Sequence, residues 1–181
     1  MGVLVAAPTA GSSGIVPGLL LSLQQSYSFS DEQMIDALFN AGAIGYLAMR
    51  NATVAGAVGG CQAEVGVAAA MAASAAVELM GGTPVQSLDA ASTVLINMLG
   101  LVCDPVGGLV EVPCVKRNVM GAVNALSCAD MALAGLDGGI PCDEVIDAMG
   151  AVGRAMPPSL RETGEGGLAA TPTGRRIAER R

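Results

Sequence analysis

The chain has 181 residues, of which 52% are hydrophobic, 14% charged and 2% aromatic, and its net charge is −7. This length predicts one domain, residues 1–181, and the acidic balance argues against a nucleic-acid partner. Ordinary domains are about 25% charged, so we expect other copies or chains to cover part of the surface in a homo- or hetero-oligomer. The longest stretch of low charge, Val65–Val77, is too short for a membrane span of about 20 residues, and no membrane partner is expected.

Helical periodicity and capping signals predict an all-α protein, a compact bundle of about six helices. An extended segment, residues 1–7, leads into a turn of small residues, 8–14. Ser30 followed three residues later by Gln33 is a capping box and starts the second helix. The predicted helices are Ile15–Tyr27, Asp31–Tyr46, Gln62–Met80, Val85–Leu101, Asn118–Leu136 and Asp143–Met156.

One of these helices, Gln62–Met80, is apolar on nearly every face and rich in alanine and glycine. That composition is typical of a helix buried on all sides, so we expect it at the centre of the bundle. Residues 159–181 hold glycines, threonines and arginines and are predicted to form a C-terminal tail that wraps a partner.

Three of the five cysteines stand where the backbone turns. Cys61 follows two glycines, Cys103 precedes Asp-Pro, and Cys114 follows a proline. At such positions a sulfur can point into a cavity, as a metal ligand must. Cys128 and Cys142 lack this setting and are interpreted as packing residues. The odd number of cysteines, with no secretory segment, predicts a reducing compartment, the cytoplasm.

Thiolates bind soft metals, here zinc or an iron-sulfur cluster. The chain contains no Cys-x-x-Cys pair and no histidine, which weakens the case for zinc. Three thiolates on a four-iron cubane leave one iron open to a substrate, as a Lewis-acid enzyme needs. Spacing alone leaves simple packing of these cysteines as an alternative.

Four contiguous motifs resemble the iron-sulfur L-serine dehydratase family, either its α chain or the equivalent catalytic domain of its single-chain members. They are Ala7–Gly14, Gly60–Gly66, Met80–Pro84 and Cys103–Cys114. The resemblance implies a 4Fe-4S cluster held by Cys61, Cys103 and Cys114, and a reaction that converts L-serine to pyruvate and ammonia. It also implies a β chain or β domain as partner, and a further segment before Met1 that this chain lacks. Because the chain has no histidine, an imidazole base would come from elsewhere, and the chain alone is expected to be inactive.

Several polar residues near these motifs are candidates for substrate contacts. Thr9, Ser12, Ser13 and Gly14 open a helix and would cradle a carboxylate, or act as ordinary caps. Glu64 is either a proton-transfer group or a helix-start carboxylate. Asn118 either hydrogen-bonds substrate or caps the long helix that follows it.

Other functions remain as alternatives. A cysteine desulfidase-like enzyme would use the same open iron to expel sulfide. A non-catalytic helical oligomerisation module would bind no iron at all. Pyridoxal phosphate would need Lys116, the single lysine, but no phosphate-binding glycine loop precedes that residue, so we expect no pyridoxal phosphate.

Overall fold

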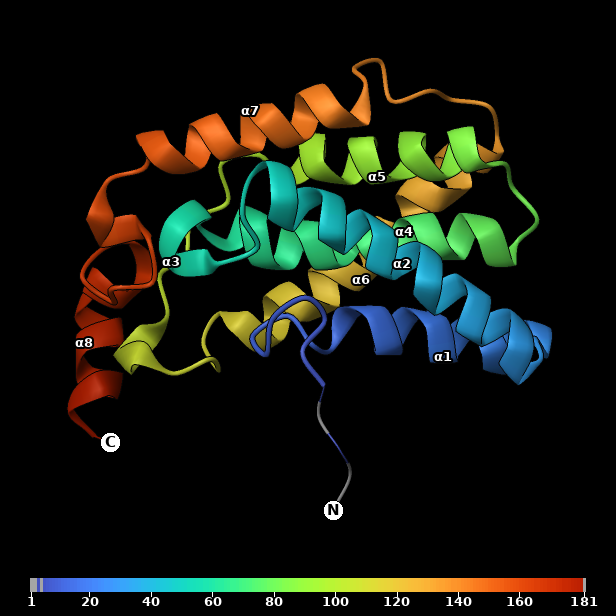
Figure 1. Ribbon diagram of the computed structural model, residues 1–181. Coiled ribbons are helices and arrows are strands. Elements are labelled where there is room, and N and C mark those ends of the chain that lie inside the picture. The colour runs from blue at the N-terminus through green and yellow to red at the C-terminus, as the bar shows by residue number, and fades with distance from the viewer. Residues whose placement is uncertain (1–2, 4, 181) are drawn as a thin grey trace.

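The computed structural model describes residue 3 and residues 5–180, which form a helical bundle (Figure 1). The described residues contain eight α-helices and no β-strand. Their bounds are α1 Ile15–Tyr27, α2 Asp31–Asn51, α3 Gly56–Gly59, α4 Val67–Leu79, α5 Pro84–Met98, α6 Cys114–Leu133, α7 Cys142–Ala155 and α8 Pro172–Glu179. A π-helical turn, Gln62–Gly66, leads into α4, and short 3₁₀ turns lie at Val106–Gly108, Pro158–Leu160 and Gly167–Ala170. The all-α prediction is confirmed; of the residues expected to be extended, Met1, Gly2 and Leu4 lie outside the described part.

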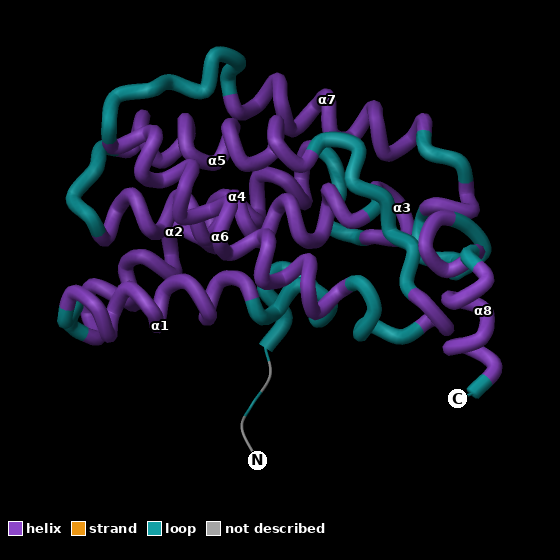
Figure 2. The backbone as a smooth tube through the Cα atoms, turned by 180° about the vertical axis from the view of Figure 1, so that it is seen from behind, coloured by secondary structure: helices purple, strands orange, loops and turns teal. Residues whose placement is uncertain are grey.

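The centre of the bundle is α4, as predicted. Every residue from Val67 to Val77 is buried, and α4 packs against α1, α2, α5 and α6 (Figures 1 and 2). Small side chains let the neighbouring helices approach closely: a Cβ added to Gly45 of α2 would lie 2.9 Å from the Met71 sulfur of α4. This close packing explains the low aromatic content.

The helix starts follow the capping chemistry in the sequence. Ser30 accepts a hydrogen bond from the Gln33 amide, and the Gln33 side chain accepts one from the Ser30 amide at 2.9 Å, so the predicted capping box is present. Thr83 and Gln86 form a second capping box in front of α5, with Pro84 in its first turn. Two reciprocal hydrogen bonds at each start satisfy amides that the helix leaves unpaired.

The prediction of about six helices was too low. The two additional ones are α3, a single turn, and α8, which lies inside the predicted C-terminal tail. The Thr171 side chain accepts a hydrogen bond from the Gly174 amide, and Pro172 occupies the first turn of α8. This is the same Thr-Pro start as in α5, but the helix has only eight residues, and few of them are apolar.

The segment before α8 also belongs to the domain. The Cys103 amide donates to the Leu160 carbonyl at 2.9 Å, and the Glu162 amide donates to the Cys103 carbonyl at 2.7 Å. That this tail wraps a partner stays a prediction, and the structure adds that the tail also contacts its own domain. Its backbone is paired with the loop that carries Cys103.

The long helix α6 begins at Cys114, four residues before its predicted start at Asn118. Pro113 immediately precedes it, and proline favours the first turn and the boundary of a helix because its φ is already close to helical. The β-branched Val112 and Val115 around it hide this signal in the sequence. Asn118 is consequently not the N-cap of α6.

The described helices include none that is both long and apolar enough to cross a lipid bilayer. Large apolar side chains do remain exposed on several helices, α2 and α6 among them. On α2 these include Phe39, with 77% of its surface exposed, and on α6 they include Val119 and Val123, with 63% and 62%.

Candidate metal centre

The three cysteines predicted to bind metal lie at one end of the bundle, where α3 and the starts of α4 and α6 meet (Figure 1). Cys61 directly precedes the π-helical turn, Cys103 lies in the loop after α5, and Cys114 is the first residue of α6. All three are buried, with 2%, 2% and 6% of their surfaces exposed. A π-helical turn within a helix often marks a functional site, and here it lies between Cys61 and α4.

The carboxylate of Glu64 lies close to two of these sulfurs, those of Cys61 and Cys103. The ligand atoms of Cys61, Glu64 and Cys103 all lie within 4.8 Å of one another. The Cys103 sulfur is 4.0 Å from Glu64 Oε2. Cys114 is outside this tight group, but the charge of Cys61 still acts on its pKa. The structure thus brings Cys61, Glu64 and Cys103 into one close group from segments far apart in the sequence, with Cys114 near it.

The three thiols differ in acidity. A hydrogen bond from the Cys103 thiol lowers the pKa of Cys61, and the positive charge of Arg117 lowers it further. The pKa of Cys103 is raised, first by that same hydrogen bond and then by burial. Burial raises the pKa of Cys114 to about 11. Cys61 is thus the first of the three to be a thiolate, and metal binding would release protons from the others.

Arg117 and Asp104 were not predicted as site residues. Arg117 Nη1 lies 3.5 Å from the Cys61 sulfur, 2.8 Å from the Val102 carbonyl oxygen and 2.8 Å from Asp104 Oδ1. Asp104 Oδ2 accepts a hydrogen bond from the Leu168 amide at 2.7 Å. The spacing holds a signal for both residues: Arg117 is three positions after Cys114, on the same helical face, and Asp104 follows Cys103 directly.

Glu64 is partly buried against the two sulfurs. Burial raises the pKa of its carboxyl group, hydrogen bonding by Thr9 opposes this rise, and the negative charge of Glu162 adds to it. Gly56 leaves the space that Glu64 occupies, because a Cβ there would lie 2.6 Å from Glu64 Oε2 and 3.2 Å from the Cys103 sulfur. A carboxyl group in this setting holds its proton to a higher pH than a solvent-exposed glutamate does.

The segment that carries Thr9, Ser12, Ser13 and Gly14 lies beside Glu64, at the start of α1. A Cβ added to Gly11 would be 3.6 Å from Glu64 Oε1. Within the turn, Thr9 Oγ1 and Ser12 Oγ are 3.0 Å apart, and Ser13 Oγ donates to the Ala10 carbonyl at 2.8 Å. The Thr9 side chain also hydrogen-bonds Glu64. The segment therefore has a defined shape next to the centre.

Asn118 connects this segment to α6. Its Oδ1 accepts from the Gly14 amide at 3.1 Å, and its Nδ2 donates to the carbonyls of Gly11 and Cys114 at 2.8 and 3.0 Å. Its amide group is thereby occupied with protein partners. In this structure Asn118 positions the turn against the helix that carries Cys114.

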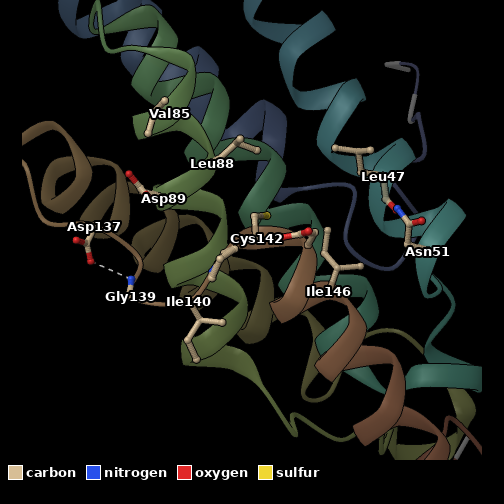
Figure 3. A pocket seen from close by; sticks show the side chains of 12 residues that line it. Leu47, Asn51, Val85, Leu88, Asp89, Asp137, Gly139, Ile140, Cys142 and Ile146 are labelled. Atoms are coloured by element: carbon tan, nitrogen blue, oxygen red, sulfur yellow. Dashed lines mark hydrogen bonds between the residues drawn. The ribbon is translucent and has the colours of Figure 1, made fainter.

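The remaining two cysteines lie elsewhere. Cys128 is buried within α6, where Asn97 Nδ2 donates to its sulfur at 3.5 Å. Cys142 is the first residue of α7, the helix-start position expected from the sequence. It lines a groove of about 530 Å³ whose wall residues come from α2, α5 and α7 and include Leu47, Leu88 and Ile146 (Figure 3). This groove contains none of the predicted site residues.

A second cavity, of about 540 Å³, adjoins the predicted substrate segment. It is lined by Gly11, Ser13, Gly14 and Asn118 on one side and by Val110 and exposed valines of α6 on the other. A small polar molecule entering it would meet the turn and the start of α6. The cavity thus offers an approach to this end of the bundle.

The donor set fits a thiophilic metal or cluster. Three buried sulfurs from separate segments supply soft ligands, and Arg117 offsets part of their negative charge. The fold and this centre together define an all-helical protein with a buried cysteine site suited to metal-dependent chemistry.

Comparison with known proteins identifies the family. The family model described as "Serine dehydratase alpha chain" matches residues 1–169. The chain is 62% identical over 180 residues to the "Probable L-serine dehydratase, alpha chain" of Bacillus subtilis, and 59% identical over 174 residues to the protein of that name in Latilactobacillus sakei. It is 53% identical over 177 residues to the "L-serine dehydratase, alpha chain" of Peptoniphilus asaccharolyticus. The chain therefore belongs to the serine dehydratase alpha chain family.

These relatives differ in how far they extend beyond the matched region. The alignments cover 99%, 96% and 98% of this chain. They cover 60% of the Bacillus protein, 83% of the Latilactobacillus protein and 61% of the Peptoniphilus protein. The chain thus spans about three fifths of the length of two of the relatives that it matches.

Proposed function

We propose that this chain carries the catalytic centre of an iron-sulfur L-serine dehydratase, which converts L-serine to pyruvate and ammonia. The observation that carries the proposal is the meeting of Cys61, Cys103 and Cys114 at one end of the bundle. It is supported by membership of a family whose members are named for this reaction. We assign the three cysteines as ligands of a 4Fe-4S cluster.

When bound through three cysteines, such a cluster supplies an open iron that acts as a Lewis acid toward the serine hydroxyl and carboxylate. The protein's part is to hold the sulfurs as thiolates. Arg117 favours this form at Cys61, which its Nη1 approaches to 3.5 Å. Asp104 and the Val102 carbonyl hold the guanidinium in place, so its charge stays directed at the sulfur.

Glu64 is assigned to proton transfer. Its carboxyl group lies beside the two sulfurs, and burial raises its pKa, which favours the protonated form that can donate a proton. A leaving hydroxide needs a proton, and Glu64 is the carboxyl group in position to deliver it.

The turn before α1 is assigned to the substrate carboxylate. Among the described residues, the amides of Gly11 and Ser12 donate to no protein acceptor, and they stand at the positive end of α1. The carboxylate would be held by these two amides, in the turn whose shape Thr9, Ser12, Ser13 and Gly14 maintain, with Asn118 fixing the turn against α6. This assignment places the substrate between the turn and Glu64.

We assign removal of the α-proton to a group outside this chain, because this chain has no histidine. The relatives' names contain "alpha chain", and a β chain or β domain would supply the base and complete an oligomer. We expect the chain alone to turn over little L-serine. The reaction needs no pyridoxal phosphate in this proposal, and Lys116, the single lysine, is exposed on α6.

Anaerobic reconstitution with iron and sulfide tests the ligand assignment. We expect about four irons per parent chain and a broad iron-sulfur absorbance without a sharp aldimine band. Cys61→Ser, Cys103→Ser and Cys114→Ser should lose the cluster, whereas the matched controls Cys128→Ser and Cys142→Ser should retain it. Retention in the first three variants, or loss in Cys128→Ser, would show that the assignment is wrong.

A further inference from the structure

The ligand atoms of Cys61, Glu64 and Cys103 are closer together than a four-iron cluster requires. A cubane separates its cysteine ligands by the width of the cluster, but a single ion gathers them around one point. With metal-to-sulfur and metal-to-oxygen distances of about 2.3 and 2.0 Å, tetrahedral ligand atoms lie about 3.5 to 3.8 Å apart. The Cys103 sulfur and Glu64 Oε2 are 4.0 Å apart, and all three ligand atoms lie within 4.8 Å of one another. Inward movement of under about 1 Å would complete a three-ligand site.

The charges around this group also suit one divalent cation. Two thiolates and one carboxylate carry three negative charges, and a divalent ion offsets two of them. Arg117, at 3.5 Å from the Cys61 sulfur, contributes a further positive charge from outside the ligand set. Its guanidinium is fixed by the Val102 carbonyl and by Asp104, as residues behind a metal ligand commonly are.

The three donor groups are shielded from solvent. Cys61 and Cys103 are each only 2% exposed, and Glu64 is partly buried between Gly56 and the turn before α1. Cys114 does not belong to the tight group. The third ligand of a single ion is thus a carboxylate, whereas the third ligand assigned to the cluster is a sulfur.

We propose that, in the chain without a cluster, Cys61, Glu64 and Cys103 bind one thiophilic divalent cation such as zinc or cobalt(II). Three protein ligands leave a fourth, open position for water. The ion and the cluster share two cysteines, so they exclude each other. Bound zinc would therefore block assembly of the cluster until it is removed.

Cobalt titration tests the ligand set directly. The full 181-residue chain, freed of cluster and kept anaerobic with a phosphine reductant, is titrated with Co²⁺ while thiolate-to-cobalt absorbance is recorded. We expect one ion per parent chain, with affinity lowered at least about 100-fold in Cys61→Ser, Cys103→Ser and Glu64→Gln, since even residues behind the ligands change affinity 10- to 100-fold. Cys114→Ser and the control Cys128→Ser should bind cobalt like the parent. Circular dichroism melting of each variant separates lost ligands from lost folding.

Two outcomes would overturn the proposal. One is a loss of affinity in Cys114→Ser equal to that in Cys61→Ser, with Glu64→Gln unchanged, which would make the third ligand a sulfur. The other is cobalt binding in the parent no tighter than in the Cys61→Ser/Cys103→Ser double variant.

Zinc competition tests mutual exclusion. One equivalent of zinc, added before iron and sulfide, should reduce iron uptake by the parent several-fold, because the ion occupies Cys61 and Cys103, two of the three assigned cluster ligands. Glu64→Gln should take up iron under the same conditions. Unchanged iron uptake in the zinc-loaded parent would refute the exclusion. The cluster proposal and the single-ion proposal can be tested independently of each other. Cys114→Ser is expected to lose the iron-sulfur cluster but to keep the single ion.

Discussion

The ion pair between Arg117 and Asp104 gives the sharpest prediction about stability. The two side chains are 14% and 3% exposed, and Arg117 Nη1 lies 2.8 Å from Asp104 Oδ1. Replacing Arg117 by methionine leaves the Asp104 carboxylate buried with one remaining hydrogen bond, from the Leu168 amide. It also removes the 2.8 Å hydrogen bond to the Val102 carbonyl. Breaking a buried pair by removing one partner costs about 3 to 5 kcal/mol, and we expect a loss in this range for Arg117→Met.

Urea unfolding of the metal-free chain, followed by circular dichroism, measures this loss. The double variant Asp104→Asn/Arg117→Met should recover at least about 1 kcal/mol relative to Arg117→Met, because the unpaired charge is gone. The exposed Arg175→Met is the control and should change the free energy of unfolding by less than about 0.5 kcal/mol. A cost below about 1 kcal/mol for Arg117→Met, or strictly additive single variants, would refute the reasoning.

Three further predictions follow from the surroundings of the site. Gln62→Leu should destabilise the chain by about 2 to 4 kcal/mol in urea unfolding, since Gln62 is buried and bonds backbone groups of α7 and the loop after α5 at 3.0 and 2.9 Å. Gly56→Ala should lower iron content and cobalt affinity several-fold, because the new Cβ would lie 3.2 Å from the sulfur of Cys103, a ligand in both proposals, and would displace the carboxylate of Glu64. Cys142 has a pKa raised by burial to about 11 from its ordinary 9.0. The unfolded chain therefore loses this proton first, and stability should fall as pH rises from about 9 to 11, more steeply in the parent than in Cys142→Ser.

Each of these three predictions has a control variant or an outcome that would contradict it. Gln25→Leu on the exposed side of α1 should leave stability nearly unchanged, and a Gln62→Leu cost equally small would contradict the role of the buried amide. Gly42→Ala, whose new Cβ would meet nothing within 4 Å, should not reduce iron content. If parent and Cys142→Ser lose stability in parallel above pH 9, the buried thiol is not the cause.

Much of the fold was predictable because its signals are local. Ser30 and Gln33 specify the start of α2 by themselves, and the uncharged, mostly apolar stretch Val65–Val77 identifies the central helix. The starts of α6 and α8 were missed for a different reason. Pro113 and Pro172 mark both starts, but β-branched neighbours in one case and short length in the other hide the helical periodicity.

The site was predictable in its sulfurs and less so in their surroundings. Glycine and proline neighbours indicate that Cys61, Cys103 and Cys114 stand at chain turns, and the structure brings these turns together. No local pattern reveals that Arg117 reaches both Cys61 and Asp104, because those contacts depend on how α6 docks against the loop after α5. The role of Asn118 was hidden likewise, since its partners Gly11 and Gly14 are more than a hundred positions away in the chain.

The central claim is that three cysteines hold a cluster with one open iron, and mild oxidation tests it most directly. The reconstituted chain is treated anaerobically with ferricyanide while electron paramagnetic resonance and iron content are measured. We expect the cluster to lose one iron, the one without a cysteine ligand, and to give a three-iron signal. This signal should disappear when ferrous iron and a reductant are added back. Breakdown of the whole cluster without a three-iron species, or a cluster that keeps all its iron, would contradict the claim.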